Sequence, residues 1–130
     1  MKITLINILV VDDSLTIRIK FKDYLSNHGF EVHEASNGME ALEMLKRNSE
    51  IKLIISDLNM PTMDGMTFID FVRNEEGNKD IPIMIYSTEL DKDLKEEAKK
   101  LGVNAWVSKP LNQNKILTAI KGLLEKASNN

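Results

Sequence analysis

Five short, mostly apolar segments alternate along the chain with segments in which apolar residues recur every three or four positions. The short segments have the length and composition of strands, and the others have the spacing of amphipathic helices. The predicted strands are residues 5–11, 31–36, 52–56, 81–86 and 103–108. The predicted helices lie within residues 14–29, 39–47, 66–74, 91–101 and 113–126.

Local signals mark several ends of these helices. Ser14 is a good N-cap for the first helix, because its hydroxyl can accept a backbone N–H of the first turn. Gly29 and Gly102 follow the first and fourth helices, where glycine commonly ends a helix. The polar stretch 75–80 contains Gly77 and is expected to form a loop.

The composition of the strands indicates their order in a sheet. Strands that alternate with helices through right-handed crossovers form a parallel sheet with helices on both faces. The first, third and fourth strands are continuously apolar, as central strands are, whereas the second and fifth include polar residues such as His33 and Asn104. We therefore predict an α/β fold: a doubly wound, five-stranded parallel sheet of order 2-1-3-4-5, which is the flavodoxin-like (βα)5 arrangement.

Polar side chains stand directly after the predicted strands at the carboxyl edge of this sheet. They are, in chain order, Asp12, Asp13, Asp57, Ser87, Thr88 and Lys109. In open parallel sheets, ligands gather at the carboxyl ends of the strands, next to the point where the strand order reverses. That point lies between the first and third strands, so we expect Asp12, Asp13 and Asp57 to adjoin.

Taken singly, these acids have simpler explanations. Asp12 and Asp13 can serve as a solvated cap and first-turn acid of the first helix, and Asp57 can be a turn residue. Together, three adjacent carboxylates repel one another unless a cation bridges them. Mg²⁺ is a hard cation that accepts a few carboxylates and keeps several waters, and with Lys109 it would neutralise the cluster. The pattern therefore indicates magnesium-dependent phosphoryl chemistry.

Composition limits the remaining possibilities. The chain has 130 residues, which we interpret as a single domain, 1–130, with a core of about 5–126. It contains no cysteine, which excludes disulfides and thiolate chemistry, and its net charge of −3 gives no field for binding nucleic acid. Residues 1–11 are interrupted by Asn7 and followed by two acids, so we interpret them as a strand rather than a signal peptide. No apolar stretch is long enough to span a membrane.

These motifs resemble those of response-regulator receiver domains, most closely the stand-alone, CheY-like chemotaxis type of two-component signalling. The resemblance covers about residues 7–126, and strand order 2-1-3-4-5 is the order for which this family is known. The matching segments are Val10-Val11-Asp12-Asp13-Ser14, Ser56-Asp57-Leu58-Asn59-Met60-Pro61, Asp64-Gly65, Ser87 and Lys109-Pro110.

The resemblance implies a role for each site residue. Asp57 would accept the phosphoryl group, and Asp13 and Asp57 would ligate Mg²⁺ directly. Asp12 would act mostly through water, and Asn59 through its main-chain carbonyl. Ser87, Lys109 and the backbone N–H groups of Asn59 and Thr88 would contact the phosphoryl group. The Lys109–Pro110 peptide bond would be cis.

The resemblance also implies a function and partners. A histidine kinase would phosphorylate the protein, and Ser87 and Trp106 would relay the change to the surface of the fourth helix, fifth strand and fifth helix, where a target binds. We expect no output domain, a cytoplasmic monomer, no enzymatic activity beyond self-phosphorylation and dephosphorylation, and a role in chemotaxis. A phosphorelay intermediate or a phosphate sink uses the same residues, and dimerisation on phosphorylation stays open.

Several residues have plain alternatives. Trp106 can be a half-exposed aromatic of an edge strand, and Leu111 departs from the phenylalanine usual after Lys109-Pro110.

Asn59 and Glu89 stand where the family tunes hydrolysis, and their polarity predicts a short-lived phosphoryl group. Isolated histidines such as His28 are usually solvated or structural. The lysines of the fourth helix form a solvated face or a partner contact: Lys92, Lys95, Lys99 and Lys100.

Two other functional classes fit the residues less well. A hydrolase with an aspartyl nucleophile, of the haloacid-dehalogenase kind, usually has an acid two residues after the nucleophile, but here that residue is Asn59. A flavin or nucleotide carrier on the same fold needs a loop rich in Gly, Ser or Thr after the first strand. Asp12 and Asp13 would repel a phosphate there.

Overall fold

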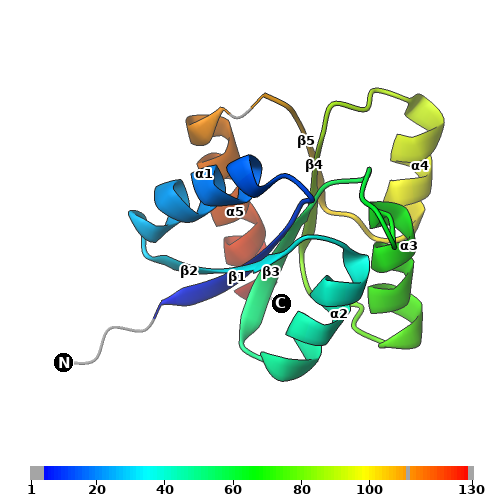
Figure 1. Cartoon of the computed structure of the whole chain (residues 1–130), viewed down its shortest axis with the longest axis horizontal. Coiled ribbons are helices and arrows are strands. Elements are labelled where there is room, and N and C mark those ends of the chain that lie inside the picture. The colour runs from blue at the N-terminus through cyan, green and yellow to red at the C-terminus, as the bar shows by residue number, and fades with distance from the viewer. Residues whose placement is uncertain (1–4, 111, 129–130) are drawn as a thin grey trace.

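One parallel sheet with helices on both faces organises the chain (Figure 1). The computed structural model describes residues 5–110 and 112–128. The strands are β1 (Ile6–Val11), β2 (Phe30–Ala35), β3 (Ile51–Ser56), β4 (Ile83–Ser87) and β5 (Ala105–Ser108). The helices are α1 (Leu15–Ser26), α2 (Gly38–Arg47), α3 (Gly65–Asp70), the π-helical turn η1 (Phe71–Glu75), α4 (Lys92–Lys100) and α5 (Gln113–Ser128).

The strand order is β2-β1-β3-β4-β5, which confirms the prediction. Val11 of β1 pairs with Ser56 of β3, and the N–H of Asp57 donates to the carbonyl of Val11 at 2.9 Å. Further along the sheet, Ser87 of β4 pairs with Ser108 of β5. This register aligns the carboxyl ends of the strands, so that the residues that follow them share one edge.

The sheet separates two apolar clusters. Helices α2, α3 and α4 cover one face, and α1 and α5 cover the other (Figure 1). Successive residues of a strand point to opposite faces, so that Leu9 joins the first cluster and Ile8 the second. Burial on both faces explains why the central strands are continuously apolar.

The structure differs from the sequence-based expectation at the ends of some elements. β4 begins at Ile83 rather than at residue 81 and includes Ser87, and β5 begins at Ala105 rather than at residue 103. The third helix does not end regularly, because residues 71–75 form a π-helical turn in which Glu76 N–H donates to the Phe71 carbonyl. Apolar periodicity alone cannot distinguish such a turn from α-helix. His28 is exposed beyond the C-terminus of α1 and contacts the Tyr24 carbonyl.

A buried arginine joins η1 to the end of α4. The Arg73 guanidinium donates to the carbonyls of Leu101, Gly102 and Asn78 at 3.1, 2.9 and 3.1 Å. Burial lowers the pKa of Arg73 from its ordinary value, and the Asp80 charge opposes that shift. Because the donors match carbonyls at the C-terminal end of a helix, this contact anchors the end of α4 to η1 on the same face of the sheet.

Among the described residues, none of the helices combines the length and the apolar character needed to cross a membrane.

We expect Arg73→Met to lower the free energy of unfolding by about 2–4 kcal/mol, because the three backbone carbonyls lose the donors that the buried guanidinium supplies. Urea unfolding followed by circular dichroism measures the change. Arg47→Met is the matched control, since Arg47 is exposed and, among the described residues, forms an ion pair only with Glu43, at 3.8 Å. That change should stay below about 0.5 kcal/mol, and equally small effects from both variants would contradict the anchoring role of Arg73.

Candidate functional site

Three carboxylates converge at the carboxyl ends of β1 and β3. Asp12, Asp13 and Asp57 each place an oxygen within 4.8 Å of the others. Asp12 and Asp57 are buried, with 2% and 7% of their surface exposed, whereas Asp13 is exposed. The acids that we expected to adjoin are therefore together.

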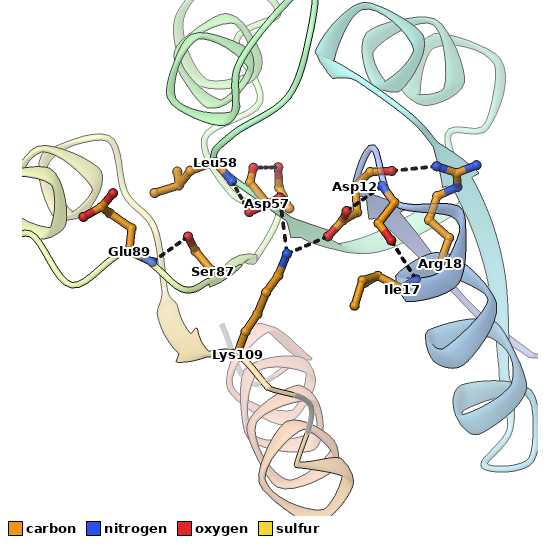
Figure 2. Close-up of polar contacts among 10 residues, drawn as sticks. Asp12, Ile17, Arg18, Asp57, Leu58, Ser87, Glu89 and Lys109 are labelled. Atoms are coloured by element: carbon orange, nitrogen blue, oxygen red, sulfur yellow. Dashed lines mark hydrogen bonds and ion pairs between the residues drawn. The ribbon is translucent and has the colours of Figure 1, made fainter.

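Backbone N–H groups orient the two buried carboxylates. Ser14 N–H donates to Oδ1 of Asp12, and Leu58 N–H donates to Oδ1 of Asp57, both at 2.8 Å. The Oδ2 atoms contact Lys109 instead (Figure 2). The Lys109 Nζ lies 3.2 Å from Oδ2 of Asp12 and 3.3 Å from Oδ2 of Asp57. One ammonium, supplied from the end of β5, thus joins the acids that follow β1 and β3.

The charges of this cluster are not balanced. Burial raises the pKa of Asp12 above its ordinary value, and the Asp57 charge adds to the rise. The Ser14 N–H and Lys109 act in the opposite direction without cancelling it. A raised pKa means that the surroundings disfavour the ionised carboxylate, so that a further cation would stabilise the ionised cluster.

The loop that carries Asp57 is fixed by the start of α3. Asp64 caps α3 by accepting the N–H of Thr67 at 2.9 Å, and Gly65 N–H donates to the carbonyl of Leu58 at 2.8 Å. A Cβ on Gly65 would lie 2.2 Å from the carbonyl oxygen of Asp57. Glycine is therefore required here by the close approach of two backbone segments.

The hydroxyl of Ser87 lies at the end of β4, beside the acids. It is buried and accepts the N–H of Glu89 at 3.1 Å, which leaves its own proton free to donate elsewhere (Figure 2). The Glu89 carboxylate turns toward the backbone of its own loop, where it accepts the N–H groups of Leu90 and Asp91. Thr88 and Asn59 are exposed on the same edge.

The Lys109–Pro110 peptide bond is cis, as the family resemblance implied. Leu111, the position at which the chain departs from the family, lies outside the described residues.

The donors at this edge fit a hard divalent cation. Three carboxylates within 4.8 Å supply oxygen ligands and negative charge, and one of them is exposed and so leaves room for water. Mg²⁺ prefers this combination of few carboxylates with retained waters. Imidazole and thiolate donors, which softer transition metals favour, are not part of the cluster.

Comparison with known proteins identifies the family. Residues 8–121 match the model of the response regulator receiver domain. The chain belongs to this family. Receiver domains of this kind are phosphorylation-activated signalling switches.

Relatives of this receiver domain include chemotaxis proteins. It is 44% identical over 104 residues to chemotaxis protein CheY1 of Helicobacter pylori, and the aligned region covers 79% of this chain and 84% of that protein. It is 37% identical over 122 residues to the CheY homolog of Campylobacter jejuni, covering 93% and 94% of the two chains.

Solved structures of receiver domains have the same architecture. CheY4 of Vibrio cholerae matches with a TM-score of 0.86 and 35% identity, over 92% of this chain and 99% of that one. A CheY from Borrelia burgdorferi, in a complex with CheX, BeF3 and Mg²⁺, matches with a TM-score of 0.84 and 26% identity, over 90% and 87% of the chains.

Trp106 of this receiver domain lies apart from the acids, on the α4 side of β5. It is partly buried against the first apolar cluster, and its Nε1 is buried with no hydrogen-bond partner among the described residues. The Nζ of Lys95 on α4 lies 5.5 Å from the centroid of the indole ring. The relay from Ser87 through Trp106 stays a prediction.

Sequence reasoning missed Arg18, which supports the acid cluster from α1. Its Nη1 donates to the main-chain carbonyl of Asp12 at 2.7 Å, and its Nε donates to Glu34 at 3.1 Å (Figure 2). Arg18 follows the N-cap Ser14 by one helical turn, which places it above the loop of Asp12 and Asp13. The spacing from Ser14 to Arg18 indicated that Arg18 would lie near this loop. The sequence did not indicate its acceptor, because every residue has a backbone carbonyl.

We expect Mg²⁺ to stabilise the receiver domain, because it binds the folded acid cluster and offsets the mutual repulsion. At about ten times its Kd, Mg²⁺ should raise the free energy of unfolding by about 1.4 kcal/mol relative to EDTA. Asp13→Asn removes one of the repelling charges, so it should be more stable in EDTA by about 0.5 kcal/mol and gain little from Mg²⁺.

Urea titrations in EDTA and in Mg²⁺ test both statements. Asp23→Asn is the control, since Asp23 is an exposed acid of α1 outside the cluster and should keep the full response to Mg²⁺. Equal stability of the unsubstituted protein with and without Mg²⁺ would show that the cluster does not bind the ion.

Proposed function

We propose that Asp57 accepts a phosphoryl group from the phosphohistidine of a histidine kinase, and that this receiver domain then changes its affinity for a target protein. The observation that carries the proposal is the arrangement around Asp57. Its buried carboxylate lies within the acid cluster and contacts the Lys109 ammonium at 3.3 Å.

Asp57 is the nucleophile. A carboxylate oxygen of Asp57 attacks the phosphorus while the bond from phosphorus to the donor's nitrogen breaks, and the product is an acyl phosphate. Phosphoryl transfer depends mainly on the positioning and electrostatic stabilisation of the transferring group. The hydrogen bond from Leu58 N–H and the contact with Lys109 hold the carboxylate for in-line attack.

Asp13 and Asp57 would hold Mg²⁺ directly, Asp12 mostly through water, and Asn59 through its main-chain carbonyl. When bound, the ion would neutralise carboxylates and polarise the oxygens of the phosphoryl group. Asp12 also keeps Lys109 close to the acceptor, because their 3.2 Å ion pair fixes the ammonium on the β1 side of Asp57.

Lys109 and Ser87 would contact the transferred group. The Lys109 ammonium, at the end of β5, contacts Asp57 at 3.3 Å, and the proton of the Ser87 hydroxyl, at the end of β4, can donate to a phosphoryl oxygen. The backbone N–H groups of Asn59 and Thr88 would add two further donors. After transfer the site is more anionic than before, because a singly charged carboxylate is replaced by a group of charge near −2.

The switch would run from Ser87 to Trp106. The two residues belong to adjacent strands, and Trp106 pairs with Ile85, which lies two positions before Ser87 in β4. Movement of the Ser87 hydroxyl toward the phosphoryl group would alter the β4–α4 loop, which now donates the Glu89 N–H to that hydroxyl. The altered surface of α4, β5 and α5 would then control binding of the target.

We infer a role in chemotaxis, supported by the names of the relatives from Helicobacter pylori and Campylobacter jejuni. Those names favour this role over a phosphorelay intermediate, a phosphate sink or an aspartyl-nucleophile phosphatase. The receiver domain would act in the cytoplasm, and a CheX-like protein is one class of partner, by analogy with the Borrelia burgdorferi complex.

We expect one added phosphoryl group when the protein is incubated with acetyl phosphate and Mg²⁺ and followed by intact mass. Asp57→Asn removes the nucleophile and should abolish the addition, as should EDTA. Asp64→Asn is the matched control: it changes a nearby exposed acid that caps α3, and Asn caps helices as well as Asp does.

Phosphorylation of Asp57→Asn at the rate of the unsubstituted protein would contradict the assignment of the acceptor. Bound Mg²⁺ without any phosphoryl addition, from acetyl phosphate or from a phosphorylated histidine kinase, would contradict the proposed function while leaving the metal site intact.

The phosphoryl group should be lost quickly, because Asn59 and Glu89 are polar groups beside the site. Asn59→Ala and Glu89→Ala should each slow the loss, and neither should prevent phosphorylation. Intact mass followed over time after removal of the phosphodonor measures the rate. Unchanged decay in both variants would remove these residues from that role.

A further inference from the structure

An aromatic ring lies under the lysine of the site. Tyr86 precedes Ser87 in β4, and the Nζ of Lys109 lies 5.4 Å from the centroid of the Tyr86 ring. A cation this close to an aromatic face is attracted by the ring quadrupole, and the attraction grows where water is excluded. The Lys109 side chain is 18% exposed, so the contact is largely shielded.

Tyr86 itself is held in place. It is 1% exposed within the cluster on the α1 and α5 side of the sheet. The rings of Tyr86 and Phe21 pack edge to face, with their centroids 5.1 Å apart and an interplanar angle of 89°. Such edge-to-face pairs fix ring orientation, so the surface offered to Lys109 is rigid.

The ring, rather than the hydroxyl, is the part of Tyr86 available to the site. The hydroxyl oxygen is buried and has no hydrogen-bond partner among the described residues. Burial raises the pKa of Tyr86, and the charges of Asp12 and Asp57 raise it further, so the phenol stays neutral. A neutral phenol keeps the negative ring face that attracts an ammonium.

We propose that Tyr86 is a positioning residue for Lys109, and that its ring face holds the ammonium between Asp12 and Asp57. This inference rests on the proposed function for its effect on phosphoryl transfer. The contact has a particular use in a switch, because phosphorylation alters Asp57, one of the two carboxylates that bind Lys109. Phosphorylation leaves the Tyr86 ring and Asp12 chemically unchanged, so these two groups keep the Lys109 ammonium next to the transferred phosphoryl group.

The first test compares rates of phosphorylation by acetyl phosphate with Mg²⁺. Tyr86→Leu removes the ring and should slow the reaction about three- to tenfold, because Lys109 loses one of its three contacts. Tyr86→Phe keeps the ring and should retain the rate within about twofold. Phe68→Leu, in the apolar cluster on the opposite face, controls for loss of a large buried side chain.

A double-mutant cycle separates positioning from packing. In a Lys109→Met background, Tyr86→Leu should cause no further slowing, since the group that the ring positions is gone. Equal slowing with and without Lys109 would overturn the proposal, as would an unchanged rate in Tyr86→Leu. Loss of rate in Tyr86→Phe equal to that in Tyr86→Leu would also overturn it, by assigning the effect to the hydroxyl.

A second measurement does not depend on phosphorylation. The protons of the Lys109 ε-methylene should be shifted upfield in NMR spectra by the Tyr86 ring, with the signal assigned by its loss in Lys109→Met. The shift should persist in Tyr86→Phe and disappear in Tyr86→Leu. An ordinary lysine shift in the unsubstituted protein would overturn the proposal, whereas an upfield shift without phosphorylation would refute only the proposed function.

Discussion

The mutual repulsion of three carboxylates is the constraint on which the rest of this structure depends. Two unit charges 4.8 Å apart repel by about 3.5 kcal/mol at an effective dielectric constant of about 20. The fold holds Asp12 and Asp57 together nevertheless, through backbone donors on their Oδ1 atoms and one ammonium between their Oδ2 atoms. The site is therefore built with a deficit of positive charge, which suits it to a divalent cation.

Rigid elements keep this arrangement in place. The acids follow directly from β1 and β3, which are buried on both faces, and Lys109 follows directly from β5. The backbone approach at Gly65 fixes the loop beyond Asp57, and the Arg18 contact fixes the carbonyl of Asp12. A site supported in this way can use electrostatic stabilisation without reorganising at the moment of transfer.

The opposite ends of α4 are held differently. Its C-terminal end receives two hydrogen bonds from the buried Arg73, whereas its N-terminal end follows the β4–α4 loop, whose contacts run through Ser87 and Glu89. A change at Ser87 therefore acts on the less firmly anchored end of the helix. Trp106 and Lys95 meet between α4 and β5, so a shift of α4 would alter their contact as well.

The sequence by itself determined the alternation of strands and helices and the strand order, and it predicted that Asp12, Asp13 and Asp57 would adjoin. Continuous apolar runs indicate strands that are buried on both faces, and helical spacing indicates helices that are buried on one face. The acids directly after the apolar runs lie at the ends of strands because of their position in the chain. The π-helical turn at residues 71–75, the Arg73 anchor and the Arg18 contact needed the tertiary structure, because their acceptors are backbone carbonyls brought close only by packing. The contact of Tyr86 with Lys109 was likewise decided by the fold, since it depends on which face of β4 the ring occupies and on the distance across to the end of β5.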